Sequence, residues 1–389
     1  MPRTAVPAPL SHSPAAPGTS GRRRPIRHLY FHIPFCPKLC PYCSFYVEVG
    51  AKNKNRGFLN AILRDVELAA EQYDLRPETI YFGGGTPSSL LADQLEYLLG
   101  GLRDRLDLSA LKEWTLEANP ATVRPEKAKL LRSLGVSRIS LGVQSWDDAL
   151  LKTLGRVHNA AAAERTYHTL REAGFLGVNI DLMFAVPGQS HEQWFATLAK
   201  TAELAPDHVS TYCLTYEEDT DYFRKLTGGV FVQEEERDAR LFEETMDRLS
   251  AHGFTQYEIS NHARPGHESQ HNRAYWLGAD YLGFGPSAFS TVGLHRWEKV
   301  RDTALYSARI LAGEDATGFR ESLTPAQRAG ETAAFRMRTI EGMPATELAP
   351  WAAAMAQFQQ AGLLEKNGEN LRLTRRGKLL ADTVAEALV

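Results

Sequence analysis

Three cysteines lie close together in the run FHIPFCPKLCPYCSFY, at Cys36, Cys40 and Cys43. Their spacing is C-x-x-x-C-x-x-C. Disulfides within so tight a loop would leave one sulfur unpaired. The three thiolates can instead surround one inorganic cluster, because Fe–S clusters are held by Cys thiolates. A four-iron cubane with three protein ligands keeps one iron open, where a small molecule can bind. The segment therefore predicts a [4Fe–4S] cluster with an open iron.

A zinc site and buried structural thiols are weaker alternatives for the three cysteines. A zinc site usually takes four Cys or His ligands at matched spacings. The nearby candidates for a fourth ligand, His28 and His32, lie upstream in an expected strand. Buried structural cysteines would need a core element, whereas Pro34, Pro37 and Pro41 mark a loop.

The bulk composition sets the scale of the protein. The chain has 389 residues, 43% of them hydrophobic, which is enough for one large domain and a smaller one. The 44 basic and 47 acidic residues give a net charge of −3, so nothing here favours a nucleic acid partner. No apolar run is long enough to cross a membrane. The remaining cysteine, Cys213, stands alone, which argues against a disulfide framework and favours a reducing, cytoplasmic compartment.

Residues 1–26 differ from the rest of the chain. They are rich in Pro, Ala and Ser, they include Arg22-Arg23-Arg24, and they contain no acidic residue. This composition predicts a disordered tail. An organelle transit peptide is the alternative, but the prolines weaken the amphipathic helix that it needs. A bacterial cytoplasmic protein is the favoured interpretation.

From residue 27 to about 260, short apolar strands alternate with amphipathic helices. Strands expected at 27–33, 79–87, 113–120, 138–145, 178–189 and 208–217 are separated by helical patterns. Such alternation implies parallel strands joined by right-handed crossovers. About six β/α units are too few to close an eight-fold barrel. Periodicity alone leaves open an α/β doubly wound sheet or a partial barrel.

The alternation ends in the last third of the chain. Residues 261–300 are expected to connect the first domain to a second one at 301–389. Three helical patterns there enclose LLEKNGENLRLT, which predicts a hairpin with its turn at Asn-Gly-Glu-Asn. Helices with a small wing suggest a winged-helix-like module. Its basic residues are few and scattered, so we expect it to cover the barrel mouth rather than to bind nucleic acid.

Polar residues stand at the carboxyl ends of the expected strands, where parallel β/α folds collect ligands. Gly83-Gly84-Gly85-Thr86-Pro87 removes side chains where a ligand could approach the backbone, and no Lys-Ser/Thr follows to make a phosphate loop. Glu117 and Gln144 each end a later strand, and Arg156 follows a short helix. Asp181 lies inside an apolar strand, where a carboxylate is costly unless it is paired.

The cysteine spacing, with Tyr42 before the last Cys, resembles the radical S-adenosylmethionine (SAM) superfamily. The string at residues 29–36, LYFHIPFC, is similar to the oxygen-independent coproporphyrinogen III oxidase group, and the resemblance runs over most of 29–389. It implies a (β/α)6 partial TIM-like barrel that binds SAM at the open iron. The residues that the resemblance assigns to SAM are Tyr30, Tyr42, Gly84, Gly85, Thr86, Glu117, Gln144, Arg156 and Asp181.

Two features of the sequence separate the branches within that group. The dehydrogenases carry a fourth cysteine two residues after the third, where this chain has Phe45. The run His271-Asn272-Arg273-Ala274-Tyr275-Trp276 matches the H-N-x-x-Y-W motif of the haem-chaperone branch, and residues 280–288 match its next motif. The resemblance implies that this region handles haem, with His271 as a candidate iron ligand and His262 or His267 as alternatives.

The expected function is therefore a haem chaperone that binds a [4Fe–4S] cluster, SAM and haem and delivers haem to an acceptor haemoprotein. The alternative is a coproporphyrinogen III dehydrogenase, which would make the chain an enzyme. A zinc-dependent regulator is a third, contrasting class. An electron donor is implied in either radical SAM case, and a homodimer is possible. The residues identify no catalytic side chain.

Overall fold

The computed structural model describes residues 23–50 and 55–389, and most of the tail expected at 1–26 lies outside these ranges. At the centre is a sheet of twelve described strands in the order β14-β13-β12-β11-β1-β4-β5-β6-β7-β8-β10-β9. Six consecutive members are parallel to one another. They are β1 (Arg24–Ile33), β4 (Tyr73–Gly84), β5 (Glu113–Ala118), β6 (Arg138–Gln144), β7 (Gly177–Phe184) and β8 (His208–Cys213).

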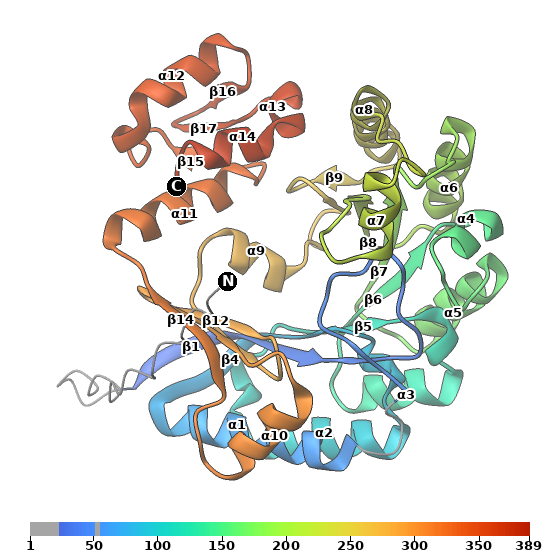
Figure 1. Ribbon diagram of the computed structural model, residues 1–389, viewed down its shortest axis with the longest axis vertical. Coiled ribbons are helices and arrows are strands. Elements are labelled where there is room, and N and C mark those ends of the chain that lie inside the picture. Colours follow the sequence, from blue (N-terminus) through green and yellow to red (C-terminus); the bar gives the residue numbers. More distant parts are fainter. Residues whose placement is uncertain (1–22, 51–54) are drawn as a thin grey trace, which may run out of the picture.

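Helices follow these strands, and most of them lie on the outer side of the curved sheet (Figure 1). They are α1 (Asn55–Gln72), α2 (Ala92–Arg105), α3 (Pro125–Ser133), α4 (Asp148–Thr153), α5 (Ala160–Glu172), α6 (His191–Leu204), α7 (Asp221–Thr227) and α8 (Glu235–Ala251). Their starts follow from local chemistry. Pro125 opens α3, and Ser190 and Gln193 form a capping box at α6. The predicted α/β partial barrel is confirmed.

The barrel is open because β1 and β8 pair with other strands and not with each other. Beside β1 lies β11 (Tyr281–Phe284), also parallel, followed by the antiparallel strands β12 (Phe289–Val292), β13 (His295–Lys299) and β14 (Thr317–Ser322). Beside β8 lie β10 (Asn261–Ala263) and β9 (Thr255–Gln256), both antiparallel to their neighbours. The boundaries expected at 261 and 301 stay predictions; in the structure, four strands between 281 and 322 lengthen the main sheet.

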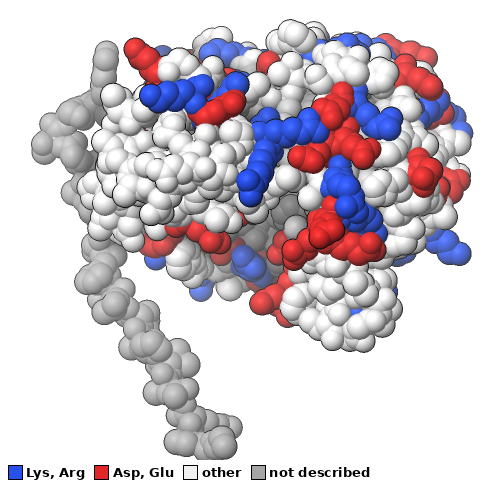
Figure 2. All heavy atoms as spheres, turned by 90° about the horizontal axis from the view of Figure 1, so that it is seen from above, with Lys and Arg blue, Asp and Glu red and all other residues white. Residues whose placement is uncertain are grey.

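A separate hydrophobic core forms in what we call the C-terminal unit, residues 325–389. Its elements are α11 (Pro325–Met337), β15 (Met343–Pro344), α12 (Ala352–Gln360), β16 (Leu364–Asn367), β17 (Asn370–Leu373), α13 (Arg375–Leu379) and α14 (Ala381–Glu386). Strands β16 and β17 pair as the predicted hairpin. Figure 2 looks from above onto the top of the molecule and shows acidic and basic side chains next to one another on that face.

Strand faces explain where the polar residues point. Along β4, Ile80 and Phe82 are fully buried in the main core, whereas Thr79, Tyr81 and Gly83 alternate with them. Because successive side chains of a strand point to opposite faces, these alternate residues line the inside of the barrel. Apolar residues thus hold the helices outside, and polar residues line the interior. No helix within the described ranges is both long and apolar enough to span a membrane.

Candidate cluster and cofactor site

The three cysteines lie at the carboxyl end of β1. Cys36 ends the short strand β2 (Phe35–Cys36), which pairs with β3 (Glu48–Val49), and Cys40 and Cys43 follow in a turn closed by a backbone bond of 3.1 Å between them. All three thiols are free and partly exposed. The Thr86 hydroxyl lies 3.3 Å from Cys36 Sγ, and Arg156 Nη1 donates to Cys40 Sγ at 3.5 Å. The loop therefore meets residues from two later strands.

Burial decides the protonation of the thiols in the metal-free chain. It raises the pKa of Cys36, and it raises the pKa of Cys43 to about 11. Metal binding would therefore have to release protons. Among the described residues, no set of three or more His, Cys, Asp or Glu gathers around a single-ion position. His28 and His32, the zinc alternative, are engaged elsewhere, with Thr79 and with the Tyr46 carbonyl.

The glycine segment at the end of β4 packs directly against the cysteine loop. Gly85 N donates to the Ile33 carbonyl at 2.9 Å, and Thr86 N donates to the Phe35 carbonyl at 2.9 Å. Gly84 has φ of +99°, and a Cβ there would collide with the His32 ring. A side chain at Gly84 would thus be strained and would clash, so this position requires glycine. The bare backbone remains next to Cys36.

Glu117, on β5, lies beside this backbone. Tyr81 donates its hydroxyl to Glu117 Oε1 at 2.8 Å. Burial raises the pKa of the Glu117 carboxyl to about 7, although bonds from Tyr81 and from the Gly84 N–H act in the opposite direction. A carboxyl group poised near neutral pH inside the barrel could accept or hold a proton from a bound ligand.

Glu117→Gln is expected to stabilise the cofactor-free chain at alkaline pH. The folded carboxyl keeps its proton up to about pH 7, whereas the unfolded one releases it near 4.5. The folded state then binds more protons than the unfolded state, so wild-type stability falls as pH rises through this window, and that of the glutamine variant does not. Urea unfolding should show that the free energy of unfolding of the variant, relative to the wild type, increases from about pH 5 to pH 8, by about 3 kcal/mol at most. A pH-independent difference would contradict it.

Gln144 and Arg156 face the same end of the barrel. Gln144 ends β6 with a left-handed φ of 70°, which is uncommon for a side chain of this kind. Arg156 follows α4 and donates Nη2 to the Gly142 carbonyl at 2.9 Å. Gln144 Oε1 and Arg156 Nε are buried and have no hydrogen-bond partner among the described residues. Buried polar atoms without partners indicate that a ligand belongs there.

Asp181 does have protein partners. On β7 it accepts hydrogen bonds from Ser140 Oγ at 3.0 Å and from Asn179 Nδ2 at 2.7 Å. Burial raises the pKa of its carboxyl, and these donors oppose that rise. Asn179 continues to His208 Nδ1 at 2.7 Å. Protein groups therefore supply the partners that the sequence predicts for this carboxylate. Its contact with SAM stays a prediction.

The two tyrosines assigned to SAM lie at different depths. Tyr30 points into the barrel, stacks on Tyr81 with ring centroids 6.2 Å apart and bonds His32 Nδ1 at 3.1 Å. Tyr42 lies in the cysteine loop with its ring centroid 6.1 Å from that of Tyr222. The structure thus brings the cysteines, the glycine segment, Gln144 and Arg156 to one end of the barrel, with Tyr30, Glu117 and Asp181 lining its interior.

Comparisons with known proteins agree with this geometry. Residues 30–201 match the radical SAM superfamily, and residues 323–380 match the HemN C-terminal domain. The heme chaperone HemW of Mycobacterium tuberculosis is 36% identical over 93% of this chain and 94% of its own length. The chain belongs to the HemW family. HemW of Escherichia coli is 32% identical, covering 93% of this chain and 98% of its own. The solved radical SAM enzyme coproporphyrinogen III oxidase (HemN) from Escherichia coli has the same fold, with a TM-score of 0.82, 23% identity and coverage of 94% and 90%.

Radical SAM membership implies a [4Fe–4S] cluster and SAM, and the residues of this HemW-family chain fit both groups. Three thiols converge on one loop, which suits a cluster. The bare Gly84–Gly85 backbone and the unpartnered atoms of Gln144 and Arg156 suit a polar ligand beside it. A guanidinium also matches a carboxylate through paired donors. The role of each residue remains a prediction.

His271 lies inside the molecule. It is the second residue of α9 (Gln270–Trp276), a helix whose first N–H groups bond the buried Glu113 carboxylate at 3.1 and 3.2 Å. Its Nδ1 lies 2.8 Å from Thr79 Oγ1, and its ring centroid lies 5.2 Å from that of Tyr81. Burial lowers the pKa of His271 to about 3, so the ring is neutral. The H-N-x-x-Y-W motif therefore lies on a short helix.

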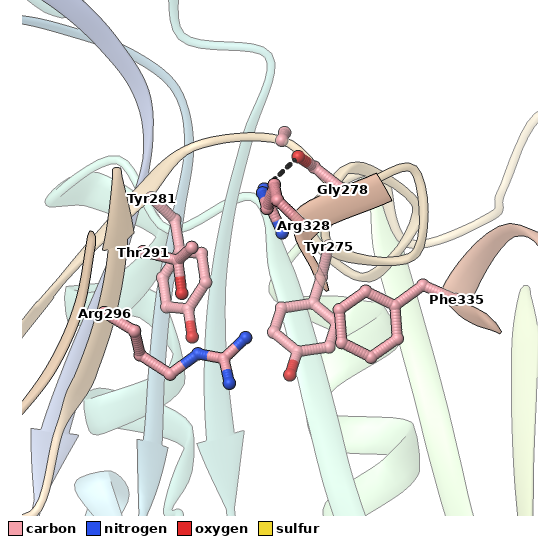
Figure 3. Close-up of a pocket in the computed structure, with 8 residues that line it drawn as sticks. Tyr275, Gly278, Tyr281, Thr291, Arg296, Arg328 and Phe335 are labelled. Atoms are coloured by element: carbon pink, nitrogen blue, oxygen red, sulfur yellow. Dashed lines mark hydrogen bonds between the residues drawn. The ribbon is translucent and has the colours of Figure 1, made fainter. Parts of the chain in front are cut away.

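The other end of α9 is open to solvent. Tyr275 is 38% exposed, and Figure 3 shows its ring facing the Arg296 guanidinium and Tyr281, with Phe335 beside it. Trp276 Nε1 is buried and has no partner among the described residues. This concave face, which we call the aromatic notch, combines flat rings with cationic groups. Arg296 is already paired with Glu321 and Glu331, so the flat rings are what this face offers to a planar ligand.

The groups that hold the site residues in place were not singled out from the sequence. Tyr81 holds Glu117, Ser140 and Asn179 hold Asp181, and Glu113 holds α9. A signal for them exists in the period-two alternation of these strands, where polar residues occupy every second position. The rule that ligands gather at strand ends does not find them, because these supports lie deeper along the strands.

Proposed function

We propose that this protein is a haem chaperone that binds a [4Fe–4S] cluster, SAM and haem and passes haem to acceptor haemoproteins. The observation that carries the proposal is similarity over 93% of the chain to relatives named heme chaperone HemW. Phe45 supports it, because this residue stands where the dehydrogenases carry a cysteine, and its side chain is 68% exposed beside the cluster loop.

The aromatic notch offers a partly exposed ring on which a porphyrin could stack. A porphyrin needs flat apolar contact, and its iron needs an axial ligand such as His or Tyr. Tyr275 is 38% exposed there, and partial burial raises the pKa of its hydroxyl, a rise that the charge of Arg296 opposes. His271 would reach a haem only after leaving Thr79 and Tyr81, so its role as ligand stays a hypothesis.

Within the barrel, the chain positions its cofactors and limits water. When bound, the cluster and SAM supply one-electron chemistry. Cys36, Cys40 and Cys43 would hold the cluster, Arg156 would face the carboxylate of SAM, and the Gly84–Thr86 backbone would face its amino group. Glu117 would accept or hold a proton beside that amino group. An electron donor is needed, and a homodimer and a cytoplasmic location stay predictions.

The alternative is oxidative decarboxylation of coproporphyrinogen III to protoporphyrinogen IX. The fold shared with HemN favours it, but at 23% identity that likeness concerns the fold alone. Both activities fit a partial barrel with a cluster at its mouth.

One anaerobic experiment separates the two functions. We expect reconstituted protein with SAM, a reductant and coproporphyrinogen III to form no protoporphyrinogen, and the same protein to bind haem stably and transfer it to a haem-depleted acceptor. Porphyrin products are measured by chromatography, and haem binding by titration of the Soret band. Turnover of coproporphyrinogen would reject the chaperone proposal, as would failure to bind haem.

A further inference from the structure

A groove separates the barrel from the C-terminal unit on the outer side of β9, and its volume is about 350 Å³. We call it the interdomain groove. Met246 from the barrel and Ile340 from the segment after α11 are partly exposed and contribute apolar surface, whereas the lining residues Phe254 and Leu373 are buried. Ligand sites in proteins span about 300–1,000 Å³ and combine apolar walls with a few polar groups. The groove is therefore large enough for a small ligand.

Three basic residues line the groove along β17 and α13. Arg372 donates to Glu365 at 2.9 Å, and Arg375 donates to Asp247 at 2.8 Å, so both guanidinium groups have carboxylate partners. Lys378 differs from them, because its Nζ donates to the neutral Gln256 Oε1 at 2.7 Å. No carboxylate among the described residues lies within ion-pair distance of Lys378.

The environment of Lys378 is unfavourable for its charge. Burial lowers the pKa of Lys378, and the neighbouring charges of Arg372 and Arg375 lower it further, while the charge of Glu365 acts in the opposite direction. An ammonium group carries three donors, and a partly buried charge is costly unless an opposite charge or acceptors meet it. A negatively charged group in the groove would supply both.

A second group nearby also lacks partners. His262 on β10 pairs in register with Gln256 on β9, so the two side chains share a face of the sheet. The His262 ring is buried, and neither of its nitrogens has a hydrogen-bond partner among the described residues. The charge of Lys378 contributes to lowering the pKa of His262. His262 is therefore a second buried polar group near Lys378, although it does not line the groove itself.

We propose that the interdomain groove binds a small organic anion, with its carboxylate or phosphate on Lys378 and its apolar body against Met246 and Ile340. This site is separate from the cluster and from the aromatic notch, and it does not depend on the haem-chaperone proposal. Because both the barrel and the C-terminal unit line the groove, a bound anion would hold them together and stabilise the folded chain.

The test uses the full chain and four simple ligands: inorganic phosphate, octanoate, octyl phosphate and the neutral 1-octanol. We expect octanoate or octyl phosphate to bind by calorimetry and to raise the unfolding temperature, and 1-octanol to bind at least about tenfold more weakly. Whichever of the two anions binds more tightly identifies the head group. Lys378→Met should reduce that affinity about tenfold or more, whereas Lys366→Met on the exposed side of β16 should leave it unchanged.

Three results would overturn the proposal. The first is that neither octanoate nor octyl phosphate binds. The second is that inorganic phosphate binds as tightly as both of them. The third is that Lys378→Met binds the anions as tightly as the wild type does. If Lys378→Met unfolds, Met246→Glu provides a second test, because its carboxylate would occupy Lys378 and should abolish anion binding in a folded protein. Haem binding, measured in the same samples, should not change in either variant.

Discussion

Cys40→Ser is expected to abolish cluster binding while the chain stays folded. Wild-type protein reconstituted without oxygen should hold about four irons per chain with a broad brown absorbance, and the variant should lose nearly all of both. Cys40 is one of three thiols on a single loop, and a cluster cannot be retained by two of them and a hydroxyl. The thiol interacts with Arg156 and Tyr42 and is partly exposed, so its loss should change the unfolding temperature little.

Cys213→Ser is the matched control. Cys213 ends β8, is exposed and lies outside the cysteine loop, so this variant should keep its full iron content. Iron is measured by chelation assay and the cluster by absorbance and electron paramagnetic resonance after reduction. Equal losses in the two variants would show that the cluster is not held by this loop. Zinc in place of iron in wild-type protein would favour the regulator alternative.

The order of strands and helices was predicted well because its signals are local, whereas the choice of a partial barrel over an open sheet came from the family resemblance. Alternating strands and helices, Pro125 at a helix start and the Asn-Gly turn of the hairpin each depend on neighbours in the chain. The strand-end residues could be gathered into one site because parallel strands place their carboxyl ends at one edge. Cys36 beside Thr86 and Arg156 beside Cys40 are consequences of that rule.

What the sequence could not show depends on register and on distant contacts. Strands β11 to β14 add to the far edge of the sheet through pairings such as Leu29 with Leu282, which no local pattern encodes. The buried His271 ring is held by a hydrogen bond with Thr79, almost two hundred residues away. The same applies to Lys378, whose lack of a carboxylate partner among the described residues emerges only when α13 meets β9. The sequence could therefore not show that His271 is engaged by Thr79 and Tyr81 rather than free to bind haem iron.

Arg156→Met is expected to weaken SAM binding by about 10- to 100-fold with the cluster still present. A guanidinium that faces a carboxylate donates two charge-assisted hydrogen bonds, and a hydrogen bond to a charged group contributes about 1.5–3 kcal/mol. Methionine keeps the length and apolar stem but removes the donors. The unpartnered Nε of Arg156 is the structural reason to expect a ligand there. Binding is measured by equilibrium dialysis with labelled SAM on anaerobically reconstituted protein.

Two further variants show whether SAM binding needs the paired donors of the guanidinium or only its positive charge. Arg156→Lys keeps a positive charge but presents a point donor, so its SAM affinity should fall between wild type and Arg156→Met. Arg165→Met, on the exposed side of α5, removes a guanidinium away from the site and should bind as wild type does. Because Arg156 also contacts Cys40, iron content must be measured in every variant. If Arg156→Met keeps its full iron and its SAM affinity is unchanged, the carboxylate of SAM lies elsewhere. Gln144, whose Oε1 has no partner among the described residues, would then be the next candidate at the barrel mouth.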